Sequence, residues 1–171
     1  MFQAPRFDIA PASVPTVPGG AGVFVTARLI RDAINKGKRR GEIIQAATAL
    51  IYTTPERDEA HEVRAVFEWV RDSIRYVRDP HGLESLSAAH VTLRRMSGDC
   101  DDQVALLGAL LESIGYPVRL VIAAYQAPNA WEHVYAQAFV NGAWIDLDPT
   151  ERQPMGWAPP DPLSLWIEGG A

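Results

Sequence analysis

One stretch decides how this chain is interpreted: Gly98-Asp99-Cys100-Asp101-Asp102, followed by the apolar run QVALLGALLESIG over residues 103–115. The apolar residues recur at helical spacing and a glycine follows them, which predicts a buried helix from residue 99 or 100 to about 114. Cys100, at its start, is the only cysteine of the chain. A lone cysteine forms no intrachain disulfide, and an acidic turn is an unusual place for a packing thiol. A chemical role for Cys100 is therefore the favoured interpretation.

Helices precede this stretch and strands follow it. Apolar stripes at helical spacing predict helices over 23–37, 41–54 and 56–74, with a shorter one over 87–95. Residues 75–78 look extended, and 79–82 read as a turn. Strands are predicted over 117–122, 131–140 and 143–147, and Asn141-Gly142 between the last two is typical of a two-residue hairpin turn. Helices first and antiparallel strands afterwards predict an α+β fold.

The proline and glycine content divides the chain into three parts. We expect a Pro/Gly-rich N-terminal arm over 1–22, one domain over 23–152, and a Pro-rich C-terminal tail over 153–171. The tail carries tryptophans and leucines, so it is expected to pack on the surface of the domain.

The composition excludes some classes of protein. A formal charge of −5 argues against non-specific nucleic-acid binding, which needs a basic face. No apolar stretch reaches the length of a membrane span, so no membrane partner is expected. The N-terminus lacks the basic and apolar segments of a secretory signal, which predicts a cytoplasmic location.

The hairpin turn fixes which side chains meet. Counting outward from Asn141-Gly142, the opposed pairs are Gln137 with Asp146, Tyr135 with Asp148, and His133 with Thr150. All six share one face of the hairpin because side chains alternate between faces. His133 and Asp148 are diagonal neighbours, about 7–8 Å apart. The register therefore favours Asp148 over Asp146 as the carboxylate that orients His133.

Cys100, His133 and Asp148 together fit a nucleophile, a base and an orienting group. A thiol in the first turn of a helix lies near the positive end of the dipole, which favours the thiolate. The backbone N–H of Cys100 is a natural oxyanion donor. Against this, nearby carboxylates raise a thiol pKa. We expect Asp99 to be the N-cap, with Asp101 or Asp102 as partners of the helix dipole.

Other residues are candidates for oxyanion donation or for support of the three: Tyr76, Asp99, Asp101, Tyr135 and Asp146. No cofactor is expected. One thiolate and one imidazole fall short of the usual zinc ligand set, although a metal-dependent hydrolase using His133, Asp146 and Asp148 stays an alternative. His81 and His90 have no matched partner and are interpreted as surface residues or neighbours of the site.

The ordered motifs resemble the transglutaminase-like superfamily, the papain-related thiol enzymes. The resemblance covers about 60–150 and rests on Gly98-Asp99-Cys100-Asp101-Asp102, His133-Val134-Tyr135, and Trp144-Ile145-Asp146-Leu147-Asp148-Pro149-Thr150. It implies a transglutaminase-like core with the catalytic cysteine at the start of a central helix packed on an antiparallel sheet. It also implies Cys100 as nucleophile, His133 as base and Asp148 as orienter. The layout looks most like small members from phage and prophage gene clusters.

The expected activity is that of a thiol hydrolase or acyltransferase acting on an amide bond of a peptide or protein. Proteolysis is favoured over cross-linking, because water needs no second substrate pocket. The alternative is a catalytically silent fold that binds a peptide or protein, for example within a phage-related assembly.

Overall fold

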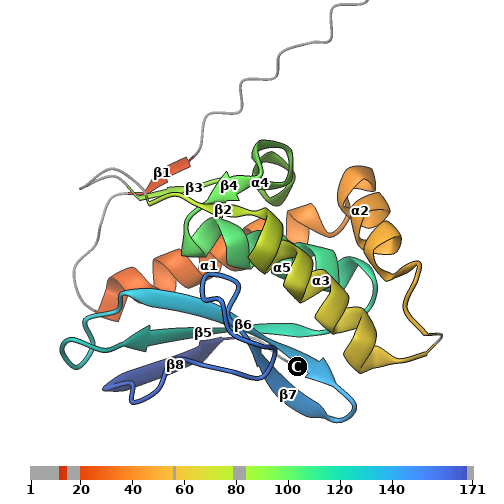
Figure 1. The fold of residues 1–171 in the computed structure, drawn as a ribbon. Helices are drawn as coiled ribbons and strands as arrows, with labels where there is room; N and C mark the ends of the chain where they lie inside the picture. Colours follow the sequence, from red (N-terminus) through yellow and green to blue (C-terminus); the bar gives the residue numbers. More distant parts are fainter. Residues whose placement is uncertain (1–11, 15–19, 56, 79–83, 169–171) are drawn as a thin grey trace, which may run out of the picture.

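The computed structural model describes residues 12–14, 20–55, 57–78 and 84–168. Within them, a layer of helices covers one face of a four-stranded sheet, and two small strand pairs lie beyond the helices (Figure 1). This is the α+β architecture that the sequence predicts. In chain order the elements are β1 (Ala12–Val14), α1 (Gly20–Gly37), α2 (Gly41–Ile51), α3 (Glu59–Ser73), β2 (Arg75–Tyr76), β3 (Glu84–Leu86), α4 (Ala89–Arg95), β4 (Ser97–Gly98), α5 (Cys100–Ser113), β5 (Val118–Ala124), β6 (His133–Val140), β7 (Ala143–Leu147) and β8 (Ser164–Glu168).

Helix α5 is the centre of the core. All its residues from 102 to 111 are buried, as expected of a helix that is mostly apolar on every side. Leu107 and Leu111 belong to one apolar cluster with Ile34 of α1, Phe67 of α3 and Leu120 of β5. The helix spans Cys100–Ser113, which confirms its predicted length. Cys100 therefore stands at the first turn of the most enclosed element of the fold.

The sheet has the strand order β7-β6-β5-β8, and every neighbouring pair is antiparallel. Asn141 and Gly142 join β6 to β7 with φ values of 50° and 83°, the positive angles that a two-residue turn requires. Val140 pairs with Ala143 and Gln137 with Asp146, so the predicted register is confirmed within the ladder. The predicted pairs of Tyr135 with Asp148 and of His133 with Thr150 lie beyond its end. The ladder ends at Leu147, and Asp148 follows directly after it.

Strand β8 is a difference from the sequence-based expectation. The tail does more than lie across the domain, because residues 164–168 pair with β5 and extend the sheet by one edge strand. Trp166 faces the helices, and its ring meets that of Phe24 edge-on at 5.1 Å between centroids. Strand β8 has only five residues and directly follows a proline-rich segment, so its alternating pattern is too short to predict a strand from the sequence.

The N-terminal arm is described only in part. Its β1 pairs antiparallel with β3, and α1 begins at Gly20, three residues before the predicted start. The other residues of the arm lie outside the described residues. So do His81 and the turn predicted over 79–82.

His90 is buried in α4, with 3% of its surface exposed, so the first of its two sequence-based interpretations, a surface residue or a neighbour of the site, is wrong. Burial lowers the pKa of His90, and the positive charge of Arg40 adds to the effect, while Glu42 opposes it. These neighbours come from the connection between α1 and α2 and from α2 itself. His90 is thus a neutral, buried part of the helix packing at neutral pH.

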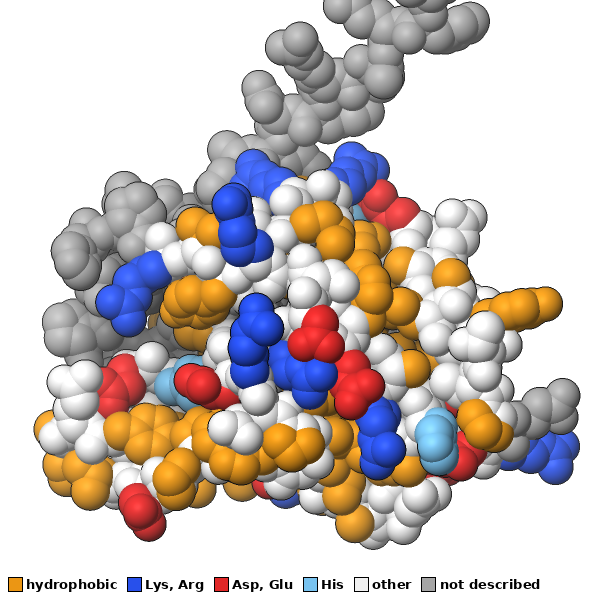
Figure 2. Space-filling view, viewed as in Figure 1, with side chains coloured by type: hydrophobic (Ala, Val, Ile, Leu, Met, Phe, Trp, Pro, Cys, Tyr) orange, Lys and Arg blue, Asp and Glu red, His pale blue; other side chains and the backbone are white. Residues whose placement is uncertain are grey.

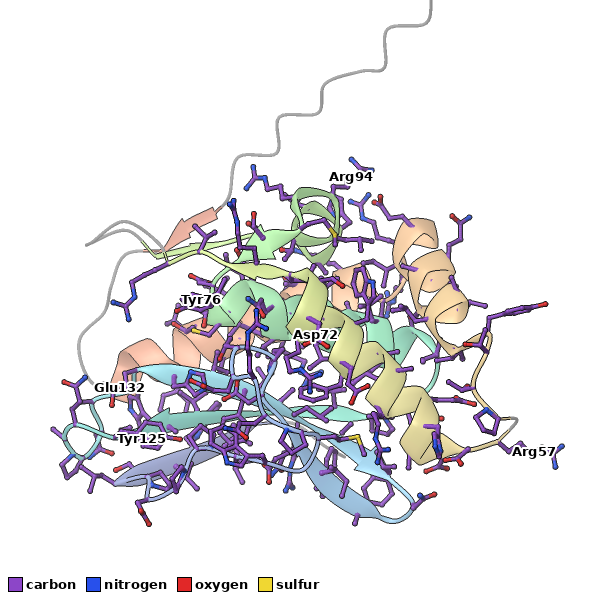
Figure 3. The ribbon with its side chains drawn as sticks, viewed as in Figure 1. Arg57, Asp72, Tyr76, Arg94, Tyr125 and Glu132 are labelled. Carbon is purple, nitrogen blue, oxygen red and sulfur yellow. The ribbon has the colours of Figure 1, made fainter. Side chains whose placement is uncertain are left out.

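Basic and acidic side chains lie next to one another at the centre of the face drawn in Figure 2. Asp72, labelled at the same place in Figure 3, is paired with Arg71 of α3 at 2.8 Å. Arg71 also donates to the backbone oxygen of Gln153 at 2.9 Å, which fastens the tail to α3. Among the described residues, no helix is both long enough and apolar enough to cross a membrane.

Candidate active site

His133 and Asp148 are joined by a direct hydrogen bond. His133 is the first residue of β6, and its Nε2 lies 2.7 Å from Oδ2 of Asp148, just beyond β7. The other oxygen, Oδ1, accepts from the backbone N–H of Thr150 at 3.0 Å and from its hydroxyl at 2.7 Å. Asp148 is only 2% exposed. Since a carboxylate only accepts hydrogen bonds, Nε2 carries the ring proton and Nδ1 is left as the basic atom.

Asp146 has a different partner. Its Oδ1 accepts from Nε2 of Gln137 at 2.6 Å, and the amide oxygen of Gln137 accepts from Nε of Arg119 at 2.6 Å. The three side chains form a row across β7, β6 and β5, at positions that face one another in the ladder. The structure therefore brings Asp148, and not Asp146, to His133, as the hairpin register predicts.

Tyr135 supports the imidazole from the neighbouring same-face position on β6. The rings of His133 and Tyr135 are stacked, with centroids 6.1 Å apart and planes inclined by 28°. Tyr135 is 4% exposed. Burial raises the pKa of its hydroxyl, and the charge of Asp146 raises it further. Tyr135 is therefore a neutral platform beside His133.

Cys100 lies where the first turn of α5 meets the beginning of β6. Asp99 is the N-cap, as predicted, because its carboxylate accepts from the backbone N–H of Asp102 at 3.1 Å. The side chain of Cys100 is half-buried. Its Sγ receives a hydrogen bond from the backbone N–H of Val134, the residue after His133. The nucleophile candidate and the base candidate thus come from neighbouring parts of the fold.

The sulfur also faces an acid. Sγ of Cys100 donates to Oδ1 of Asp101 at 3.6 Å. Burial raises the pKa of the Cys100 thiol well above its usual value, and the charges of Asp101 and then Asp99 raise it further, while the Val134 N–H opposes them. The thiol is therefore protonated in this arrangement, and the helix start does not by itself produce a thiolate.

Gly98 allows the turn before α5 to close tightly. A Cβ on Gly98 would lie 2.5 Å from Cβ of Asp102, closer than real Cβ contacts allow. Asp102 is buried, and its Oδ1 accepts from the backbone N–H of Ser87 at 2.7 Å. The oxygen of Gly98 in turn accepts from the side-chain amide of Gln103 at 3.2 Å. These contacts fix the backbone that carries Cys100.

Replacing Gly98 with alanine is expected to lower the free energy of unfolding by about 1–3 kcal/mol, because the added methyl group must displace Asp102 from its contact with Ser87. Urea denaturation followed by circular dichroism measures the change. Gly41→Ala is the matched control, since a Cβ at that helix start meets nothing within 4 Å. Equal stability of Gly98→Ala and the parent protein would contradict the close approach.

Tyr76 lies near the sulfur of Cys100. It is the second residue of β2, which pairs in parallel with β4 and places Tyr76 opposite Gly98. Burial raises the pKa of its hydroxyl, and a thiolate on Cys100 would raise it further, whereas a hydrogen bond from Arg78 lowers it. The side chain is still 47% exposed. In the view of Figure 3, Tyr76 lies on the same side as Glu132, the residue before His133.

Sequence reasoning missed two contributors to the site. One is Thr150, whose hydroxyl and N–H both hold Asp148. An aspartate side chain often accepts from the backbone N–H two residues on, and the threonine at that position adds its hydroxyl, so Asp148-Pro149-Thr150 indicates these bonds. The other is the backbone N–H of Val134, which no side-chain pattern reveals. In the described parts of the chain, no three His, Cys, Asp or Glu side chains form a group that could hold a metal ion.

The family comparison matches the core of the chain. Residues 46–149 match the family model of the transglutaminase-like superfamily. This span includes Cys100, His133 and Asp148. Among curated proteins, no significant match is found.

Solved structures with the same fold include three bacterial proteins. A candidate protease from Parabacteroides distasonis is 16% identical with a TM-score of 0.62, covering 81% of this chain and 28% of its own. A candidate cysteine protease from Cytophaga hutchinsonii is 18% identical with a TM-score of 0.52, covering 75% and 46%. LapG from Legionella pneumophila is 19% identical with a TM-score of 0.53, covering 87% and 82%. The chain thus spans less than half of the first two proteins, and at these identities the likeness extends to the fold alone.

Proposed function

The chain belongs to the transglutaminase-like superfamily, and from this premise we propose that it is a thiol-dependent amide-bond hydrolase that cleaves a peptide or protein substrate. The hydrogen bond between Nε2 of His133 and Oδ2 of Asp148 carries the proposal. It sets the imidazole tautomer that a nucleophilic thiol needs, and the β6 strand that holds His133 also contacts Sγ of Cys100.

In the first half of the proposed reaction, Nδ1 of His133 takes the thiol proton and Sγ of Cys100 attacks the carbonyl carbon of the amide. The carbonyl oxygen becomes an oxyanion. The backbone N–H of Cys100 is the proposed first donor to this oxyanion, and the hydroxyl of Tyr76 is the proposed second donor. The intermediate then collapses, the C–N bond breaks, and His133 gives its proton to the leaving amine.

In the second half, a water molecule attacks the acyl group on Cys100. His133 takes a proton from this water, the C–S bond breaks, His133 returns the proton to the sulfur of Cys100, and the free acid leaves. A primary amine in place of water would give a transamidation product by the same steps. Hydrolysis is the favoured outcome, because the reaction with water needs no pocket for a second substrate.

Other expectations from the sequence remain predictions beside this proposal. These are the cytoplasmic location, the absence of nucleic-acid and membrane partners, and the association with phage or prophage gene clusters.

The proposal is tested by incubating the protein with a peptide library and analysing the products by mass spectrometry, with Cys100→Ala as control. The parent is expected to cleave a subset of peptides, and the Cys100→Ala variant none of them. A parallel reaction with an added primary amine separates hydrolysis from transamidation. Cleavage by the Cys100→Ala variant at the parent rate would exclude the thiol mechanism. Peptides left intact by the parent would favour the binding role.

A further inference from the structure

The groups around the Cys100 sulfur come from three elements, α5, β6 and β2. On α5, Asp101 accepts the hydrogen bond of the thiol at 3.6 Å, and the charge of Asp99 also acts on the sulfur. From β6, the backbone N–H of Val134 points at the sulfur. From β2, Tyr76 lies near enough that a thiolate on Cys100 would raise the pKa of its hydroxyl, and Arg78 forms a hydrogen bond with that hydroxyl. Burial has the largest effect on the protonation of the thiol, and two acids and one backbone donor also act on it.

These neighbours do not act in the same direction. A carboxylate that accepts from S–H stabilises the thiol, and it repels the thiolate that would form if the proton left. The Val134 N–H stabilises the thiolate, yet it ranks below both acids in its effect on the sulfur. The two acids differ in what their carboxylates contact. Oδ1 of Asp101 accepts from the sulfur, whereas Oδ1 of Asp99 accepts from the backbone N–H of Asp102 at the helix cap.

We propose that Asp101 is a positioning residue that holds the resting Cys100 thiol in its protonated form and so sets the pH range in which the nucleophile reacts. This inference deepens the proposed function and rests on it for the identity of the nucleophile. Activation then consists of a proton transfer: the S–H bond breaks, an N–H bond forms at Nδ1 of His133, and the electron pair stays on sulfur. Until that transfer, the contact with Asp101 protects the thiol from oxidants and from unwanted electrophiles, since the thiolate is the reactive form.

The test measures the rate of alkylation of Cys100 by iodoacetamide from pH 5 to pH 10. Since the chain has one cysteine, mass spectrometry of the intact protein reports on Cys100 alone. Asp101→Asn keeps the shape of the side chain and removes its charge. It is expected to raise the alkylation rate at pH 7 about tenfold and to move the midpoint of the rate profile to lower pH. Asp101→Glu is expected to restore a profile close to that of the parent.

Asp99→Asn is the matched control. Asparagine caps a helix as well as aspartate does, so this variant removes a neighbouring charge without removing the contact with sulfur. It is expected to shift the profile less than Asp101→Asn. An unchanged or upward-shifted profile for Asp101→Asn, or an equal shift for both variants, would overturn the role of the contact.

Two further measurements keep the inference separate from the proposed function and from folding. Alkylation requires no turnover, so a parent that cleaves no peptide still reports on Asp101. Titration of the thiolate absorbance of the parent protein at 240 nm measures the pKa of the Cys100 thiol without any substitution. The midpoint is expected above the ordinary thiol pKa of about 8.5. A midpoint at or below that value would count against the inference.

Discussion

Replacing Asp148 with asparagine is expected to lower kcat for peptide cleavage by about 10⁴-fold with little change in KM. In the parent, Oδ2 of Asp148 accepts the proton of Nε2 of His133 at 2.7 Å. The asparagine can keep its oxygen on Thr150, and its NH₂ group then faces the ring. Because that group donates, Nε2 must become the acceptor and the proton moves to Nδ1. Nδ1, the atom proposed to take the thiol proton, then carries a hydrogen and has no free lone pair. Steady-state kinetics on a peptide identified in the library measure the loss.

Asp146→Asn is the matched control for this result. Asp146 is only two residues away on the same hairpin, but its Oδ1 accepts from Gln137 and not from His133. The variant is therefore expected to keep kcat within about tenfold of the parent, since no catalytic tautomer depends on it. Similar losses in both variants would mean that general negative charge, and not the bond to His133, supports the reaction.

Replacing Leu107 with alanine is expected to lower the free energy of unfolding by about 3–5 kcal/mol. Leu107 is fully buried in α5, and its cluster joins the helix layer to the sheet through Leu120. The substitution removes apolar contact and leaves a cavity that rigid neighbours fill only in part. Urea denaturation at 25 °C, followed by circular dichroism and tryptophan fluorescence, measures the change. Because a loss of this size is a large share of the stability of most domains, we also expect a lower thermal midpoint.

Leu163→Ala provides the comparison for that loss. Leu163 is 53% exposed and precedes the edge strand β8, so its truncation is expected to change the free energy of unfolding by about 0.5 kcal/mol or less. If Leu107→Ala were as stable as Leu163→Ala, α5 would not be the centre of the core.

The parts of the fold that the sequence predicts well are those set by local chemistry. The apolar run after Cys100 has helical spacing and ends at a glycine, so both the helix and its burial follow from nearby residues. The turn at Asn141-Gly142 fixes the register of β6 and β7, because the position of a two-residue turn determines which residues of the two strands face each other. Since that register also selects Asp148, the bond to His133 is predictable from one dipeptide and a count of residues.

The parts that the sequence does not predict depend on distant partners. Strand β8 has a short alternating pattern that becomes a strand only because β5 offers a free edge. The direction of the Asp101 carboxylate is another case, since the first turn of a helix allows it to face either solvent or sulfur. The N–H of Val134 joins the site through backbone geometry, which composition and periodicity do not encode.

The position of β8 also has a consequence during protein synthesis. Ala124 of β5 pairs with Ser164 of β8, about 40 residues later in the chain. A ribosome that adds roughly 5–20 residues per second leaves the edge of β5 without β8 for about 2–8 seconds. In that interval the nascent chain presents an apolar strand with unpaired backbone groups, which other nascent chains or a chaperone could bind. Ribosome pausing within the proline-rich segment before β8 would lengthen this period of exposure.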